Sequence, residues 1–259
     1  MKLQNKTAVV TGAGQGLGRA ISLKLAEAGA TIIIADIKPE TSAETAALIK
    51  NQFHRESMVV MTNVRREDAV VHLADKVQKT FGSLDILVNN SGIAGPRAAV
   101  EDISLDEWNE SIEVNLTGVF LMCKHFAPML KAKEKSFIVN IASVAGMRPL
   151  IMRMPYIATK AAILAVTKAM AMEFGPQIRV NSICPGAIDG PRQTQVLQKV
   201  ADQTGMLLEE VIQKKKAESP LNTFIPPSAV GDAVVFLCSD EGSYLSGTNL
   251  NVSAGAVLG

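Results

Sequence analysis

Three residue types in the second half of the sequence have the spacing of an acid–base site. Tyr156 and Lys160 stand four residues apart, so on a helix their side chains would lie on one face, one turn apart. A tyrosine hydroxyl is a poor base at neutral pH, and a neighbouring ammonium stabilises its phenolate form. Lys160 would therefore make Tyr156 a usable general acid or base. Ser143, further upstream, would donate a hydrogen bond to a substrate oxygen that gains charge during a reaction.

The same residues also have a simpler interpretation. Tyrosine and lysine four apart occur as surface pairs on helices, and a serine at the end of a strand often caps a turn. The catalytic interpretation therefore depends on a cofactor site elsewhere in the chain.

A glycine-rich segment near the N-terminus, TGAGQGLG, supplies such a site. Its pattern is T-G-x-x-x-G-x-G, because the third glycine of G-x-G-x-x-G is missing. Gly12, Gly16 and Gly18 would permit a tight turn, let the backbone approach a pyrophosphate, and begin a helix whose N-terminus faces the anion. Gln15 and Leu17 belong to the same loop and are predicted to contact the cofactor. Between a strand and a helix, this pattern favours dinucleotide binding over a turn that only connects two elements.

Asp36 ends the second apolar run, at the place where a cofactor ribose is expected. A carboxylate there accepts hydrogen bonds from the adenosine ribose and repels a 2′-phosphate, which favours NAD over NADP. Lys38, two residues later, keeps NADP open as the less favoured cofactor. Aspartate is also common in turns at strand ends, which is the alternative role for Asp36.

The apolar pattern along the chain predicts a doubly wound, Rossmann-type α/β fold that would bring these residues together. Short β-branched runs, typical of buried parallel strands, cover residues 7–11, 31–36, 57–64, 84–90, 136–143 and 178–186. Helical periodicity covers residues 17–29, 41–52, 67–80, 106–131 and 156–174. We expect one domain over residues 1–259, with about seven parallel strands and helices on both faces. Residues 187–218 interrupt the alternation and predict two small helices that act as a substrate lid.

Composition disfavours several other classes of protein. The chain has 259 residues, of which 47% are hydrophobic and 20% charged, enough for one large core. Lys and Arg number 26 against 25 Asp and Glu, so charge favours neither a nucleic-acid nor a membrane partner. No apolar run suits a signal peptide or a membrane span, and we expect a cytoplasmic protein. Three scattered cysteines and three histidines indicate neither a disulfide framework nor a metal site.

Taken in order, these motifs resemble those of the short-chain dehydrogenase/reductase family, in its single-domain branch. The resemblance rests on T-G-x-x-x-G-x-G, Asp36, NNSG, Asn115, Ser143, YIATK and PG, and it covers almost the whole chain. It implies hydride transfer between a nicotinamide cofactor and a carbinol or carbonyl. It also implies that Lys160 binds the nicotinamide ribose and that Asn115 holds a water chain that delivers protons to this lysine. Because the C-terminal region of relatives packs between subunits, it further implies a homotetramer or homodimer.

The resemblance also implies cofactor contacts outside the glycine loop. Asn90 and Gly92 of NNSG would lie near the adenosine side of the cofactor, at the carboxyl edge of the sheet. Asn63 and Val64 occupy the place of an Asp-Val pair that contacts adenine, and the Asn63 carbonyl oxygen can still accept a hydrogen bond there.

The segment PGAIDGPR departs from the family pattern. Pro185 and Gly186 match it, but a threonine that contacts the nicotinamide carboxamide is replaced by Gly190. Backbone groups of Ile188 would hold the carboxamide instead, with the Thr194 side chain as the alternative.

The substrate is predicted to be a small alcohol or carbonyl compound, and an anionic group on it is left open. Methionines between Ser143 and Tyr156 would form an adaptable apolar wall. An arginine at the rim would clamp a carboxylate, sulfonate or phosphate, against the alternative that each arginine is a solvated surface group. The candidates are Arg97, Arg148, Arg153 and Arg192.

Two other functions stay open beside an NAD-dependent dehydrogenase of secondary alcohols. One is an NADP-dependent carbonyl reductase, including a 3-oxoacyl reductase. The other is a non-catalytic dinucleotide-binding regulator, which the presence of both Tyr156 and Lys160 disfavours.

Overall fold

The computed structural model describes residues 1–148 and 150–257 and contains one parallel sheet of seven strands. The strands lie side by side in the order β3-β2-β1-β4-β5-β6-β7. They are β1 (Thr7–Thr11), β2 (Thr31–Asp36), β3 (Ser57–Met61), β4 (Ile86–Asn89), β5 (Ser136–Ile141), β6 (Ile178–Pro185) and β7 (Asn249–Val252). The order reverses between β1 and β4, and ligands of such sheets bind at this switch point, beyond the carboxyl ends of the strands. The predicted Rossmann-type fold is confirmed.

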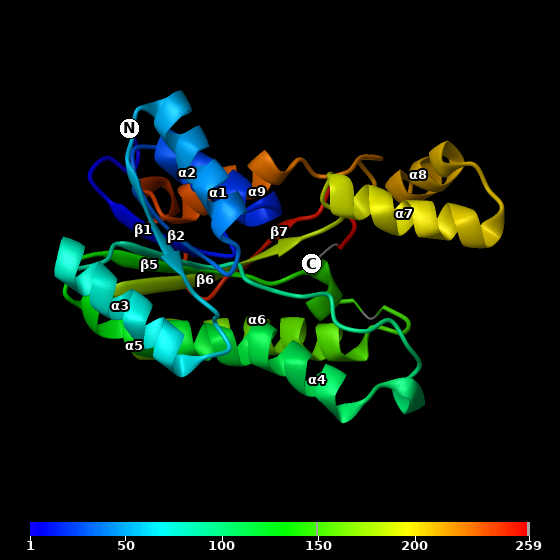
Figure 1. Ribbon diagram of the computed structural model, residues 1–259, viewed down its shortest axis with the longest axis horizontal. Helices are drawn as coiled ribbons and strands as arrows, with labels where there is room; N and C mark the ends of the chain where they lie inside the picture. Colours follow the sequence, from blue (N-terminus) through cyan, green and yellow to red (C-terminus); the bar gives the residue numbers. More distant parts are fainter. Residues whose placement is uncertain (149, 258–259) are drawn as a thin grey trace.

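Helices cover both faces of the sheet (Figure 1). One layer contains α1 (Gly16–Glu27), α2 (Pro39–Phe53) and α9 (Pro227–Leu237); the other contains α3 (Glu67–Phe81), α4 (Leu105–Ile112), α5 (Gly118–Lys131) and α6 (Met154–Phe174). Successive residues of a strand point to opposite layers, as Val9 and Val10 of β1 do. Both faces of the strands are therefore apolar, which explains their nearly continuous hydrophobic runs.

Two helices occupy most of the segment 187–218 and extend beyond the sheet (Figure 1). They are α7 (Pro191–Thr204) and α8 (Leu208–Lys216), and they form a small core of their own around Leu197, Ala201 and Val211. None of the helices in the described part of the chain is both long enough and apolar enough to cross a membrane.

The predicted helix over residues 106–131 is interrupted by a break that its apolar periodicity does not indicate. Between α4 and α5 lies one π-helical turn, Glu113–Thr117, in which the Gly118 N–H donates to the Glu113 carbonyl five residues back. Gly118 lets this helix approach Val64, because a Cβ on the glycine would come within 2.8 Å of the valine Cγ2. The turn thus adapts the helix to the loop after β3, and such turns are frequent at functional sites.

Several strands end earlier than predicted because their last residues form turns. β3 ends at Met61 rather than at residue 64, and the Asn63 side chain accepts a hydrogen bond from the Arg65 N–H at 3.1 Å. β5 ends at Ile141 rather than at residue 143, since Ser143 caps the short 3₁₀ turn that follows. These turns place polar residues at the carboxyl edge of the sheet.

Candidate active site

The side chain of Lys160 is buried at the end of β5. It is 5% exposed, and its Nζ donates a hydrogen bond of 2.7 Å to the Ile141 carbonyl. Burial penalises the ammonium and lowers the pKa of Lys160 from 10.5 to about 8. The same Nζ lies 5.8 Å from the centroid of the Tyr156 ring, so the tyrosine and lysine spaced four apart on α6 lie together.

Asn115 lies in the π turn and is fixed by three hydrogen bonds. Its Oδ1 accepts from the Ile93 N–H at 2.8 Å, and its Nδ2 donates to the Ile93 carbonyl at 3.0 Å and to the Thr159 hydroxyl at 3.2 Å. The side chain is only 1% exposed. Because Thr159 precedes Lys160, Asn115 ties the loop after β4 to the helix that carries the lysine.

Gly92, in the same loop, lies near the lysine. A Cβ on Gly92 would stand 3.2 Å from the Asn115 Oδ1 and 3.7 Å from the Lys160 Nζ. The structure thus groups Gly92 with the catalytic candidates, whereas the sequence placed it at the adenosine side of the cofactor. The loop bends back over α6 in a way that strand and helix patterns do not reveal.

Ser143 follows β5 and caps the 3₁₀ turn Val144–Gly146. Its Oγ accepts a hydrogen bond from the Ala145 N–H at 3.1 Å, and its hydroxyl hydrogen has no acceptor within the described residues, which leaves it available for donation. The turn is pressed against α6, since a Cβ on Gly146 would come within 2.7 Å of the Lys160 carbonyl. This contact fixes the distance between the serine and the helix of the lysine.

The glycine loop fits a pyrophosphate. Gly12 and Gly16 have positive φ angles of 64° and 55°, and a Cβ on Gly18 would lie 2.0 Å from the Gly12 carbonyl oxygen, so other residues would break this packing. Gln15 is the exposed N-cap of α1 and its side chain caps no N–H, while Leu17 packs against the core. The first N–H groups of α1 and its dipole therefore suit an anion.

Asp36 lies directly beneath this loop. One carboxylate oxygen accepts from the Gly14 N–H at 2.8 Å and the other from the Lys38 N–H at 3.0 Å. Each oxygen retains a lone pair for a ribose hydroxyl. The position at the end of β2, beside the loop, suits recognition of an adenosine ribose.

Thr11 and Arg19, which were not predicted as site residues, brace the loop together with Asn90. Thr11 accepts hydrogen bonds at its Oγ1 from the N–H groups of Asn90 and Ser91, at 2.9 and 3.0 Å. The Asn90 side chain donates to the carbonyls of Thr11 and Gly12, and the Arg19 guanidinium donates to the Gly14 carbonyl at 2.7 Å. Thr11 opens the glycine motif and Arg19 follows it, so their positions in the motif were the available signal.

The remaining predicted cofactor residues lie along the same edge of the sheet. Val64 is buried in the core beside Gly118, and the Asn63 Oδ1 is already engaged by the Arg65 N–H. Pro185 ends β6 and the Gly186 N–H donates to the Val252 carbonyl at 3.0 Å.

Ile188 pairs with Ile225 in a short parallel bridge, but the residues on either side of Ile188 make the hydrogen bonds of this bridge. The Ala187 carbonyl and the Asp189 N–H make the two hydrogen bonds, at 2.8 and 2.9 Å. The N–H and carbonyl of Ile188 therefore stay outside the bridge, whereas the Thr194 hydroxyl donates to the Gly190 carbonyl at 3.3 Å. This favours the backbone of Ile188 over Thr194 as a ligand for a carboxamide.

The four candidate arginines and the methionines are in different surroundings. The Arg148 Nη2 lies 4.0 Å from the Oε2 of Glu218, a residue that follows α8. Met147 packs against the core. Arg153 lies over the Tyr156 ring, and Met152 and Met154 beside it are half-exposed.

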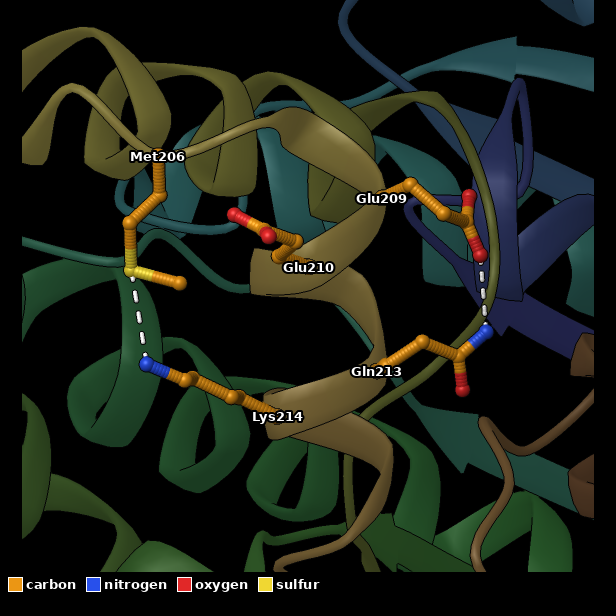
Figure 2. A pocket seen from close by; sticks show the side chains of 5 residues that line it. All are labelled: Met206, Glu209, Glu210, Gln213 and Lys214. Atoms are coloured by element: carbon orange, nitrogen blue, oxygen red, sulfur yellow. Dashed lines mark hydrogen bonds between the residues drawn. The ribbon is translucent and has the colours of Figure 1, made fainter.

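A hollow on the protruding helix pair is distinct from this site. It is lined by Met206, Glu209, Glu210, Gln213 and Lys214, all from α8 and the residues before it (Figure 2). The catalytic candidates do not line it, and hydrogen bonds within the group already engage four of its five side chains.

Comparison with known proteins matches the whole chain. The family model described as Enoyl-(Acyl carrier protein) reductase covers residues 12–257. The chain is 35% identical over 256 residues to the 3-oxoacyl-acyl-carrier-protein reductase FabG of Aquifex aeolicus, covering 98% of both. Among solved structures it resembles NAD⁺-bound xylitol dehydrogenase, with 30% identity, a TM-score of 0.92, and coverage of 98% and 100%. It also resembles L-sorbose reductase of Gluconobacter frateurii with NADPH and L-sorbose, with 28% identity, a TM-score of 0.95, and full coverage of both chains.

Proposed function

Since this chain belongs to the short-chain dehydrogenase/reductase family, we propose that it transfers a hydride between NAD and a secondary alcohol or ketone of modest size. The observation that supports this most directly is the Lys160 ammonium, buried at the end of β5 and 5.8 Å from the Tyr156 ring. When bound, the nicotinamide accepts the hydride in oxidation and donates it in reduction.

Tyr156 acts as the general acid and base. In oxidation its phenolate oxygen takes the proton of the carbinol, and in reduction its hydroxyl returns one to the carbonyl oxygen. Lys160 stabilises the phenolate by its charge, which acts strongly because water is excluded around it. Within the described residues, the Lys160 ammonium donates only to the backbone carbonyl of Ile141. Its other two N–H groups therefore remain for ribose hydroxyls or water.

Ser143 and Asn115 support the reaction in different ways. The free hydroxyl hydrogen of Ser143 orients and polarises the substrate oxygen. Asn115 holds the loop of Gly92 against α6 and thereby shapes the space around the lysine, where a proton-carrying water chain is proposed to end.

The preference for NAD rests on Asp36, with its carboxylate beside the glycine loop. A 2′-phosphate there would meet a negative charge in a site of low solvent exposure, which costs binding energy. NADP-dependent carbonyl or 3-oxoacyl reduction is the second candidate, supported by the similarity to FabG and to the NADPH-bound sorbose reductase. We also propose that α7 and α8 close over the substrate, and that the protein is a cytoplasmic homotetramer or homodimer.

Replacing Tyr156 tests the mechanism. Tyr156→Phe removes the proton donor and acceptor but keeps the ring, so we expect turnover to fall about 10²-fold or more. The dissociation constant for NADH, measured by fluorescence, should stay close to that of the wild type. Tyr244→Phe is the matched control, because Tyr244 is the other tyrosine and is fully exposed. Undiminished oxidation of polyols, hydroxy acids or aryl carbinols by Tyr156→Phe would exclude Tyr156 as the acid–base residue.

A further inference from the structure

Three arginines beside the proposed reaction centre lack the partners that the other arginines have. The chain contains nine arginines. Six of them form side-chain hydrogen bonds or ion pairs: Arg19, Arg55, Arg65, Arg66, Arg148 and Arg179. For Arg97, Arg153 and Arg192, neither a side-chain hydrogen bond nor a carboxylate at ion-pair distance is found within residues 1–148 and 150–257.

Arg153 is the central member of this group. It is the residue immediately before α6, and its Cζ lies 5.2 Å from the centroid of the Tyr156 ring. It is partly buried, and this burial is the main reason that its pKa is lowered. The positive charges of Arg192 and Arg97 lower the pKa of Arg153 further.

The three side chains come from separate parts of the fold. Arg97 follows β4, Arg153 precedes α6, and Arg192 lies in the first turn of α7. The charge of Arg192 also reaches Lys160, whose pKa it helps to lower. Arg153 and Lys160 thus hold two positive charges 5.2 and 5.8 Å from the centroid of one tyrosine ring, and an anion bound there would relieve their repulsion.

We propose that the substrate alcohol or ketone carries an oxyanion group, held by Arg153 together with Arg97 and Arg192. This inference rests on the function proposed above for Tyr156. A carboxylate, sulfonate or phosphate matches the planar fork of a guanidinium, which binds two oxygens at once. Because Arg153 stacks on the ring whose hydroxyl contacts the carbinol, the anion lies only a few bonds from the reacting carbon. The exposed side chains of Ile151 and Met152 offer an apolar rim for the carbon chain.

The pyrophosphate of the cofactor is a different anion, and the fold already provides for it. The glycine loop and the start of α1 form its site beside Asp36. Arg153 lies instead over the Tyr156 ring, so substrate affinity rather than cofactor affinity should depend on it.

Anion binding can be measured without turnover. The wild-type protein saturated with NADH is titrated with butyrate, propanesulfonate or inorganic phosphate at constant ionic strength, and with butyramide as the neutral analogue of butyrate. We expect at least one anion to bind about tenfold more tightly than butyramide, as a charge-assisted contact would give. Which of the three anions binds best identifies the group on the substrate.

Two arginine variants decide whether the cluster is responsible. Arg153→Gln should raise the dissociation constant of the preferred anion about tenfold to a hundredfold and leave the dissociation constant for NADH unchanged. Arg148→Gln removes the same charge from a residue that faces Glu218, and should leave anion binding unchanged. The proposal is overturned if no anion binds more tightly than butyramide, or if the two variants bind the preferred anion equally well. It is also overturned if Arg153→Gln weakens the binding of NADH rather than that of the anion.

The same titration separates this inference from the proposed reaction. Tyr156→Phe saturated with NADH should bind the preferred anion as the wild type does, since the ring under Arg153 is kept. Anion binding without oxidation of any alcohol would reject the proposed function and retain the anion site, whereas oxidation without anion preference would do the reverse.

Discussion

The ammonium of Lys160 and the carbonyl oxygen of Ile141 lie 2.7 Å apart in a buried position. One neutral acceptor compensates only part of the cost of burying a charge. Without cofactor and substrate, this buried charge therefore lowers the stability of the folded protein.

The cost of burying Lys160 should vanish as pH rises. The pKa is about 8 in the folded protein and 10.5 as the ordinary value, so the folded state releases its proton first. Between these values the unfolded state binds more protons, and stability rises with pH by up to about 1.4 kcal/mol per unit. Below pH 8 the cost is fully present. In urea denaturation without cofactor, Lys160→Met should therefore have a larger unfolding free energy than the wild type at pH 7. The difference in unfolding free energy between the two proteins should become smaller by pH 9.5. A gap that does not change with pH would contradict a neutralised lysine.

Asp36 should determine the choice between the two cofactors. Asp36→Asn keeps the shape of the side chain and an acceptor for the Gly14 N–H but removes the negative charge. We expect the ratio of the NADP and NAD dissociation constants to fall about tenfold, because the repulsion of the 2′-phosphate is lost. Asp75→Asn, on the exposed surface of α3, carries the same change of net charge and serves as the control. An unchanged ratio would move the source of selectivity elsewhere.

Asn115 should stabilise the fold as well as the reaction. Asn115→Ala removes both hydrogen bonds to the partly buried Ile93 backbone and the one to Thr159, which should cost about 1–3 kcal/mol of unfolding free energy. Turnover should fall by more than this loss explains, since the loop of Gly92 is released from α6. Asn109→Ala, exposed on α4, should alter neither quantity. Full activity in the Asn115 variant at a temperature where it is folded would argue against a positioning role.

The strands, the helices and the glycine loop were predictable because their signals are local. The strand that ends at Asp36, for example, has four consecutive apolar residues, 32–35, and the periodicity of the helices repeats over several turns. The approach of Gly92 to Lys160 was not predictable in the same way, because it depends on how the loop after β4 folds over α6. The four candidate arginines look alike in sequence, and only the fold shows that Glu218 lies near Arg148 while Arg153 stacks on the tyrosine.

The π turn at Glu113–Thr117 determines which side chains of α4 and α5 face the core and which face the site. Each residue of an α-helix turns the chain by about 100°, so the one extra residue in this turn sets the rotation of α5 relative to α4. Removing a single residue there would either turn Met122 and Phe126 out of the core or turn Asn115 away from Ile93. An insertion or deletion in this turn would therefore abolish the proposed activity, although every proposed catalytic residue would still be present in the sequence.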